Sequence, residues 1–259
     1  MPEGPSIVIL REQTAAFRGR KVLRVGGNSK LDLSRMQGCR IDDFRSWGKH
    51  FLICFDGFAM RVHFMLFGSY RIDDPKDTAP RLTLDFGKAG RIDFYACSLK
   101  YIEGDPDETY DWSADVMSDA WDPKAARRKL EKMPGTLVCD ALLDQDVFAG
   151  VGNIIKNEVL FRIRVHPESA VGALPARKLS EMIAQAREYS FDFLEWKKAF
   201  VLRKHYQVHT RTICPRCSAR LQYRAKLGTR QRRSFFCGHC QRLYSQVDSP
   251  TVRVQRQRK

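Results

Sequence analysis

Four cysteines form two closely spaced pairs, Cys214-Pro-Arg-Cys217 and Cys237-Gly-His-Cys240, which are separated by 19 residues. Each C-x-x-C pair presents two thiolates to one side of a tetrahedral ion, and the pairs meet when the hairpin between them closes. His239 is an alternative ligand that four cysteines make unnecessary. The spacing therefore predicts one Zn²⁺, which is structural because four thiolates leave no open coordination position.

The segment Met1-Pro2-Glu3-Gly4-Pro5 is a second group with chemical potential. Methionine is normally removed before a small residue, so we expect Pro2 to carry the free amino group. An α-amino group has a pKa of about 7.7–8.0, against about 10.4 for lysine, and is therefore more often neutral and nucleophilic at pH 7. Its attack on an aldehyde-like sugar carbon would give an iminium, with Glu3 transferring protons. Without further motifs, proline and glutamate near a terminus need have no such role.

The basic residues are concentrated in one segment of the chain. The formal net charge is +15, and residues 201–259 hold 15 Lys or Arg against one acidic residue, Asp248. The hairpin between the cysteine pairs is itself rich in arginine. This distribution favours contact with a polyanion such as nucleic acid, with a solvated charged tail as the alternative.

Composition excludes several classes of protein. The chain has 259 residues, of which 43% are hydrophobic and 29% charged, which is typical of a globular protein of one or two domains. It contains no apolar run of the roughly 18 residues that span a membrane, and its start lacks the pattern of a signal peptide. We therefore expect a cytoplasmic protein. The remaining cysteines (Cys39, Cys54, Cys97 and Cys139) are expected to be buried thiols.

The first part of the chain, residues 1–110, is predicted to form a β domain with a leading helix. A helix is expected over residues 6–17, capped by Ser6. Short strand-like runs follow at 50–55, 59–64, 81–86 and 91–95, several of them separated by turns that contain glycine. Many short strands of this kind indicate a sandwich or barrel.

The rest of the chain divides into four further segments. Residues 111–121 form a linker within an acidic stretch, and residues 122–200 read as a helical domain that begins at Asp122-Pro123. Helices are expected over 125–132, 137–143, 153–163 and 176–199. Residues 201–246 form the metal-binding hairpin, and the basic tail over 247–259 is expected to be disordered.

The motifs occur in an order that resembles the formamidopyrimidine-DNA glycosylase/endonuclease VIII family. They are Met1–Pro5, Gly48-Lys49, His63 with Gly68, Leu142–Gln145 with Gly150–Asn153 and Glu158, and the closing cysteine pairs. The resemblance implies an α+β fold with an N-terminal β-sandwich, a helix–two-turn–helix domain and a zinc finger. It also implies base-excision repair of damaged duplex DNA by a monomer that needs no cofactor other than zinc.

By this resemblance, Pro2 attacks C1′ of the damaged nucleotide and Glu3 assists opening of the sugar ring. Elimination then cuts the strand on both sides of the lost base. Lys49 holds a phosphate near the lesion, although a lysine after a glycine in a turn is by itself unremarkable.

The resemblance also implies phosphate contacts in the second half of the chain. Asn153 starts a helix whose N–H groups and dipole suit a phosphate, with Lys156 adding charge and Glu158 bracing the motif. Arg232 lies five residues before Cys237 and is expected to contact phosphates beside the extruded nucleotide. Arg233 is the rival for that role.

Three bulky residues, Met65, Leu66 and Phe67, precede Gly68 in what is expected to be a turn between strands. In the family this loop fills the gap left by the extruded nucleotide. Three such residues in succession resemble the endonuclease VIII branch, which prefers oxidised pyrimidines. A buried strand end is the alternative explanation for them.

Three other functions remain open at this point. Ser6 replaces a second glutamate that most relatives carry, which leaves lesion selectivity undecided, and a purine-lesion glycosylase of the same family is the nearest alternative. A noncatalytic damaged-DNA-binding protein and a zinc-ribbon RNA-binding protein are the others. A noncatalytic damaged-DNA-binding protein would not require Pro2, Glu3 and Lys49 together. A zinc-ribbon RNA-binding protein would leave the N-terminal motif unexplained.

Overall fold

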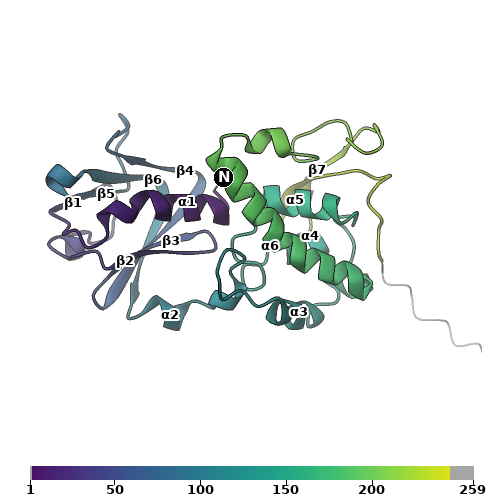
Figure 1. Ribbon diagram of the computed structural model, residues 1–259, viewed down its shortest axis with the longest axis horizontal. Helices are drawn as coiled ribbons and strands as arrows, with labels where there is room; N and C mark the ends of the chain where they lie inside the picture. Colours follow the sequence, from purple (N-terminus) through teal and green to yellow (C-terminus); the bar gives the residue numbers. More distant parts are fainter. Residues whose placement is uncertain (1, 246–259) are drawn as a thin grey trace, which may run out of the picture.

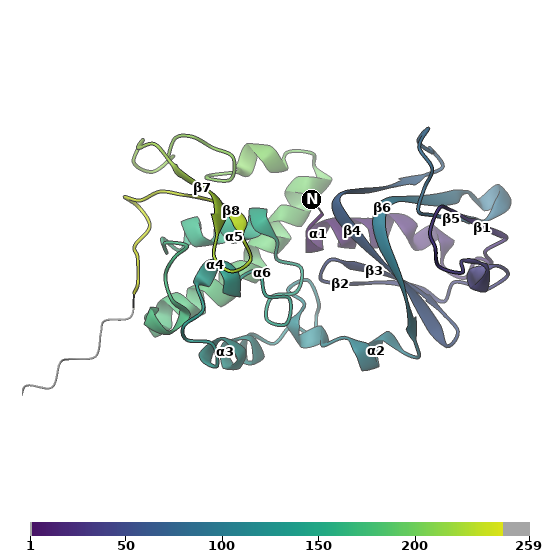
Figure 2. The same cartoon turned by 180° about the vertical axis from the view of Figure 1, so that it is seen from behind.

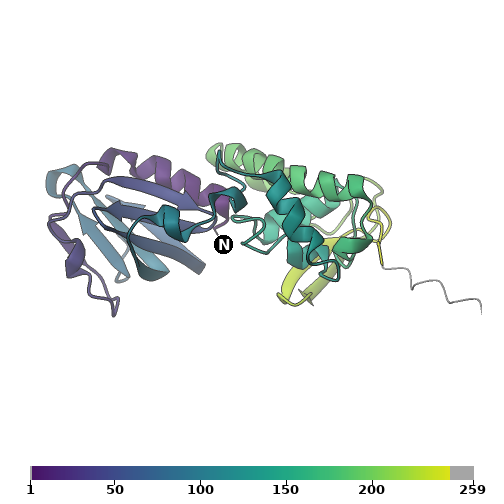
Figure 3. The same cartoon turned by 90° about the horizontal axis from the view of Figure 1, so that it is seen from below.

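The computed structural model describes residues 2–245, which form two lobes that lie side by side (Figures 1 and 3). One lobe contains the β-sheet with helix α1, and the other contains the remaining long helices and a β-hairpin. This arrangement confirms the predicted α+β class. The expected tail over 247–259 lies outside the described residues. No described helix is long and apolar enough to cross a membrane.

Six antiparallel strands are hydrogen-bonded into a single sheet. Their order is β1-β5-β6-β4-β3-β2. The two longest strands, β4 and β6, pair with each other at the centre of the sheet. On one side β3 pairs with the first half of β4, and β2 pairs with β3. On the other side β5 pairs with the first half of β6, and β1 pairs with β5. The bounds are β1 (Arg24–Gly26), β2 (Asp43–Trp47), β3 (His50–Phe55), β4 (Phe58–Ile72), β5 (Leu82–Asp85) and β6 (Arg91–Glu103).

The segment Met65–Gly68 is a bulge inside β4, whereas the sequence predicted a turn between two strands. The pairing of β4 with β6 is interrupted between Phe64 and Ser69. Gly68 is required there, because a Cβ at this position would lie 2.8 Å from the Cβ of Phe64 and 2.9 Å from the carbonyl oxygen of Ala96. The bulge therefore pushes three apolar side chains out of the sheet without ending the strand.

Helix α1 (Gly4–Thr14) packs on the sheet through Ile7 and Leu10, in a core shared with Phe51 and Ile53. The expected cap at Ser6 is wrong, because the helix begins two residues earlier, with Glu3 in the capping position and Pro5 in the first turn. Proline fits there because the first turn needs no N–H from it.

Helix α2 (Pro106–Thr109) lies between β6 and the predicted linker over 111–121, and the helical lobe follows that linker. Its helices are α3 (Pro123–Glu131), α4 (Val138–Ala141), α5 (Asn153–Arg162) and α6 (Ala176–Lys198). The predicted cap of α3 is confirmed, since the Asp122 side chain accepts the N–H of Lys124 at 2.8 Å. A single apolar core joins these helices, with Phe148, Val159 and Tyr189 fully buried in it.

The hairpin of β7 (Gln222–Leu227) and β8 (Arg232–Phe236) lies beside α5 (Figure 2). Its own apolar core is small and includes Leu221 and Val208. Glu158 of α5 connects this helix to residues 207–209, which come before the hairpin. Its buried carboxylate accepts the N–H groups of Gln207, Val208 and His209 at 2.7–3.0 Å. Glu158 thus has the bracing position that the sequence predicted.

Three glycines from distant parts of the chain meet where the lobes join. The N–H of Gly4 donates to the carbonyl of Gly150 at 2.9 Å. A Cβ on Gly48, which has a φ of +53°, would lie 2.9 Å from the Gly150 nitrogen. Glycine at these positions lets the backbones touch, so the residues beside them, Glu3 and Lys49, are brought together.

Candidate active site

The carboxylate of Glu3 caps helix α5. Its two oxygens accept the N–H groups of Gly152 at 3.1 Å, Ile154 at 2.8 Å and Ile155 at 3.2 Å. Burial raises the pKa of Glu3, and the charge of Lys49 and the three N–H groups act in the opposite direction. A carboxyl group with these opposed influences is suited to proton transfer, and the helix fixes its orientation.

This contact changes the expected role of the α5 N-terminus. The sequence predicted that its backbone N–H groups would bind phosphate, but three of them already donate to Glu3. The side chain of Asn153 is different: its Oδ1 atom is buried and has no hydrogen-bond partner among residues 2–245. The capacity for an additional ligand at this end of the helix therefore lies in the Asn153 side chain.

Lys49 lies in the turn between β2 and β3, as predicted, and is largely buried beside Glu3. Burial lowers the pKa of Lys49 to about 8. The negative charge of Glu3 opposes this shift, and the positive charges of Arg232 and Arg230 add to it. The turn thus places an ammonium group close to both the first residues of the chain and the hairpin.

Pro2 is partly buried and lines a cavity of about 850 Å³ between α1 and β4. Ser6, Gly68 and Tyr70 line the same cavity. Ser6 therefore shares this space with Pro2, next to the base of the β4 bulge. At this position the cavity wall carries a hydroxyl group.

A second cavity, of about 380 Å³, brings together residues from both lobes and the hairpin. It is lined by Glu3, Leu66, Asn153, Ile154, His209, Gln231, Arg232 and Arg233. Both candidate arginines face it, but Arg232 is also close enough to Lys49 for its charge to lower the pKa of that lysine. Of the two candidates, Arg232 is therefore the one whose charge acts on Lys49.

Sequence reasoning missed His209, which belongs to this second cavity. The Nδ1 atom of His209 lies 3.0 Å from the Nδ2 atom of Asn157, and the Oδ1 atom of Asn157 accepts the Phe235 N–H at 3.4 Å. This arrangement leaves the proton of His209 on Nε2. Burial, with help from the charges of Lys156 and Arg233, lowers the pKa of His209 to about 4. A lone histidine in a basic segment carries no spacing signal that would single it out.

The structure gives Lys156 a different environment from the predicted one. Its side chain is buried, and its Nζ atom donates to the Arg233 carbonyl at 3.0 Å and to the Ser234 hydroxyl at 2.8 Å. Burial lowers the pKa of Lys156 to about 8. Lys156 therefore joins α5 to the hairpin, and the expected phosphate contact is not available to it in this structure.

The side chains of the β4 bulge are exposed. Met65 is 54% exposed, Leu66 52% and Phe67 84%. The alternative of a buried strand end is therefore wrong for these residues. Leu66 faces the cavity that contains Glu3 and Arg232. The bulge thus carries an apolar side chain to the edge of the candidate site.

The four clustered cysteines fit a metal ion. The Sγ atoms of Cys214, Cys217, Cys237 and Cys240 all lie within 4.8 Å of one another. The separations are 3.8 Å for Cys214–Cys240 and 3.5 Å for Cys217–Cys237. A tetrahedral ion with metal–sulfur bonds of about 2.3 Å requires sulfur–sulfur separations close to these values. The hairpin can therefore hold one ion, next to the strand that begins at Arg232.

Comparison with known protein families covers both lobes of the chain. The family of formamidopyrimidine-DNA glycosylase N-terminal domains matches residues 1–96, and the family of formamidopyrimidine-DNA glycosylase H2TH domains matches residues 113–191. The chain belongs to the formamidopyrimidine-DNA glycosylase/endonuclease VIII family. The predicted resemblance is thereby confirmed.

Similar proteins place the chain on the endonuclease VIII-like branch of the family. It is 30% identical over 238 residues to endonuclease 8-like 3 of Xenopus laevis, covering 85% of this chain and 38% of that protein. It is 27% identical to endonuclease 8-like 2 of Bos taurus, covering 96% of this chain and 98% of that protein. The chain thus spans about two fifths of the endonuclease 8-like 3 relatives and nearly all of the endonuclease 8-like 2 relative.

Solved structures show the same fold. The formamidopyrimidine-DNA glycosylase of Lactococcus lactis, non-covalently bound to DNA with an AP site, has a TM-score of 0.81 at 23% identity. That alignment covers 92% of this chain and 99% of the bacterial enzyme. The arrangement of the two lobes and the hairpin is therefore that of this family member.

Proposed function

We propose that this protein is a DNA glycosylase with a coupled AP lyase activity in base-excision repair. The observation that carries the proposal is the position of Glu3, whose carboxylate is fixed by the N-terminus of α5 and lies beside Lys49. Pro2 is the neighbouring residue and lines an open cavity. In this proposal, the nucleophile and the proton-transfer group are adjacent in the chain, and Lys49 beside Glu3 is the phosphate-binding cation.

In the proposed reaction, the Pro2 amine attacks C1′ of the damaged nucleotide. The C1′–N bond to the base breaks, and the base leaves with a proton. Glu3 protonates the ring oxygen so that the sugar opens and an iminium forms with Pro2. Loss of a C2′ proton expels the 3′ phosphate, and a second elimination expels the 5′ phosphate. Water then hydrolyses the iminium and releases Pro2.

Duplex DNA is proposed to bind across the face that contains both cavities. Lys49, Asn153 and Arg232 supply contacts to phosphates around the extruded nucleotide, because each is beside Glu3 or on the rim of its cavity. Met65, Leu66 and Phe67 fill the space left in the base stack. Lys156 contributes by holding the hairpin in place, and no direct contact with DNA is proposed for it.

The preferred lesions are proposed to be oxidised pyrimidines, since a single bulge supplies all three apolar side chains of the wedge. The alternative is a preference for purine lesions such as 8-oxoguanine. We propose that the metal is Zn²⁺ with a structural role, that the protein acts as a monomer and that it works in the cytoplasm. A noncatalytic damage-binding role is disfavoured by the presence of Glu3 and Lys49 at one site.

Incision of defined duplexes tests this function. We expect cleavage of an abasic-site duplex and faster cleavage of thymine glycol than of 8-oxoguanine paired with cytosine. Faster cutting of 8-oxoguanine would overturn the preference for pyrimidines and leave the enzymatic function intact. Binding of all three duplexes without any strand cleavage would support the noncatalytic alternative.

A further inference from the structure

Asp115 is a buried carboxylate in the acidic linker between the lobes. It is 2% exposed, and its oxygens accept the N–H of Gly48 at 3.0 Å and that of Met117 at 2.9 Å. The first of these bonds reaches across 67 residues of sequence, to the turn that carries Lys49. The proposed reaction assigns this group no role.

The backbone around Asp115 also binds the other side of the site. The Val116 N–H donates to the Ala149 carbonyl at 3.2 Å, and the Ala149 N–H donates to the Ala114 carbonyl at 2.8 Å. The next residue, Gly150, accepts the N–H of Gly4. The linker is therefore hydrogen-bonded to the Lys49 turn through a side chain and to the segment before α5 through its backbone.

We propose that Asp115 is a positioning residue that holds the Gly48-Lys49 turn against Gly150, so that the Lys49 side chain stays buried beside Glu3. Without the carboxylate, the Gly48 N–H would lose its acceptor and the turn would be free to move toward water. The catalytic meaning of this inference rests on the proposed function. The structural part, which concerns the environment of Lys49, does not depend on it.

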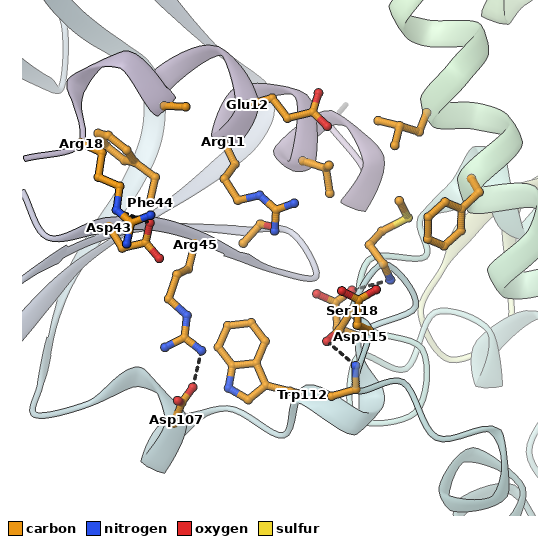
Figure 4. Close-up of a pocket in the computed structure, with 18 residues that line it drawn as sticks. Arg11, Glu12, Arg18, Asp43, Phe44, Arg45, Asp107, Trp112, Asp115 and Ser118 are labelled. Carbon is orange, nitrogen blue, oxygen red and sulfur yellow. Dashed lines mark hydrogen bonds and ion pairs between the residues drawn. The ribbon is translucent and has the colours of Figure 1, made fainter.

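Asp115 borders a cavity of about 890 Å³ between the lobes (Figure 4). The charges of Arg11 in α1 and Arg187 in α6 act most strongly on Asp115. Lys49 is the residue directly after Gly48, whose N–H Asp115 accepts. The other charged residues that line the cavity are Glu12, Arg18, Asp43, Arg45, Asp107 and Asp119. None of these groups hydrogen-bonds the Asp115 carboxylate in the part of the chain that the structure describes, so two backbone N–H groups are its direct partners.

Burial raises the pKa of Asp115 to about 6, while the N–H groups of Met117 and Gly48 and the two arginines act in the opposite direction. Since this value exceeds the ordinary 3.8, ionisation of Asp115 costs folding stability as the pH rises from about 4 to about 6. At pH 7 the carboxyl group is mainly ionised, and each of its oxygens accepts one N–H group. A buried charge that costs stability is expected at a functional position.

The direct test measures the pKa of Lys49 by pH-dependent amine labelling and mass spectrometry in Asp115→Asn. We expect the pKa of Lys49 to rise from about 8 toward 10.5, because the released turn becomes hydrated. Asp122→Asn is the matched control, since Asp122 also accepts an N–H two residues on, from Lys124 at 2.8 Å, but does so at the start of α3. An unchanged Lys49 pKa in a folded Asp115→Asn protein would overturn the inference.

Catalysis provides a second readout. In single-turnover cleavage of an abasic-site duplex, we expect Asp115→Asn to lower the rate constant about tenfold at saturating enzyme. The affinity for DNA should also fall, by at most the roughly tenfold that the Lys49 contact with phosphate contributes. Equal rates for Asp115→Asn and wild type would contradict a positioning role. If wild type shows no cleavage, the proposed function fails while the labelling result still decides the structural inference.

Hydrogen exchange of the wild-type protein covers the case in which the variant does not fold. Opening of the turn hydrates Asp115 and returns its pKa from about 6 toward 3.8, so protonation favours the closed turn. After correction for intrinsic rates, protection of the Gly48 amide should therefore rise as the pH drops through about 6. Protection that stays constant between pH 7 and pH 5 would show that Asp115 does not control the turn.

Discussion

Glu3 is the residue on which the proposed chemistry depends most closely. Glu3 lies 149 residues before Gly152, whose N–H it accepts at the start of α5. The N–H groups of the helix orient the carboxylate, and the carboxylate accepts N–H groups that have no partner within the helix. In Glu3→Gln, an NH₂ group replaces one acceptor oxygen and faces an N–H group of α5. The substitution also removes the group that transfers the proton. The substitution should lower the rate of base removal more strongly than the affinity for DNA.

Glu3→Gln is therefore expected to slow base removal by about 10²-fold or more, a typical contribution of a positioned proton-transfer group. Single-turnover release of thymine glycol measures this effect. Glu12→Gln is the control. Glu12 lies in α1, the helix that directly follows Glu3, and its carboxylate pairs with Lys198 at 2.9 Å near the surface. Equal rates for Glu3→Gln and Glu12→Gln would remove Glu3 from the mechanism.

Lys49 gives a prediction about pH. Its lowered pKa of about 8 means that the ammonium is lost as the pH rises through 8, well below the ordinary value of 10.5. Affinity for a non-cleavable abasic analogue should therefore fall about tenfold above pH 8, which corresponds to one charge-assisted hydrogen bond of about 1.4 kcal/mol. Lys49→Arg stays charged, so its affinity should lack this step. The same pH dependence in both proteins would assign the loss to another group.

At the scale of elements, the β4 bulge is predicted to act on DNA without supporting the fold. Leu66→Ala should weaken binding to a lesion duplex about tenfold, because the side chain that enters the base stack is lost. Leu23→Ala is the matched control, since Leu23 is 51% exposed, close to the 52% of Leu66. Both variants should unfold at the temperature of wild type. Equal DNA affinity for the two would show that the bulge does not contact the duplex.

The metal-binding hairpin is predicted to depend on its ion. Metal analysis should find one zinc per chain, and strong chelation or Cys237→Ser should release the β7–β8 hairpin, because its apolar core is small. Arg232 would then lose its position, and DNA affinity should fall. Calorimetry and a binding titration before and after chelation measure both effects. A chelated protein with unchanged stability and DNA affinity would contradict a structural ion.

Elements with strong local signals were predictable from the sequence. The alternation of 81–86, the Asp122-Pro123 cap and the cysteine spacing each act within a few residues, and the structure contains the corresponding strand, helix and cluster. The bulge was not predictable, because it depends on how closely Gly68 packs against Phe64 of the same strand and Ala96 of β6. The start of α1 was also missed, since Glu3 caps a different helix.

For the whole molecule, the joint between the lobes determines the site, and long-range contacts make that joint. The contacts Gly4–Gly150, Asp115–Gly48 and Glu3–α5 each join segments far apart in the chain. Periodicity and spacing carry no information about such contacts. The resemblance to a family supplied Pro2, Glu3 and Lys49 as candidates, but it did not reveal that Glu3 occupies the helix N-terminus or that Lys156 is buried.

The most direct test of the central claim is borohydride trapping on a duplex that contains an abasic site, followed by mass spectrometry of the adduct. The account predicts a covalent protein–DNA product on the peptide that begins with Pro2, and no product when an N-terminal tag blocks that amine. An adduct on a lysine, or strand cleavage by protein that retains Met1 or carries an acetylated terminus, would contradict it.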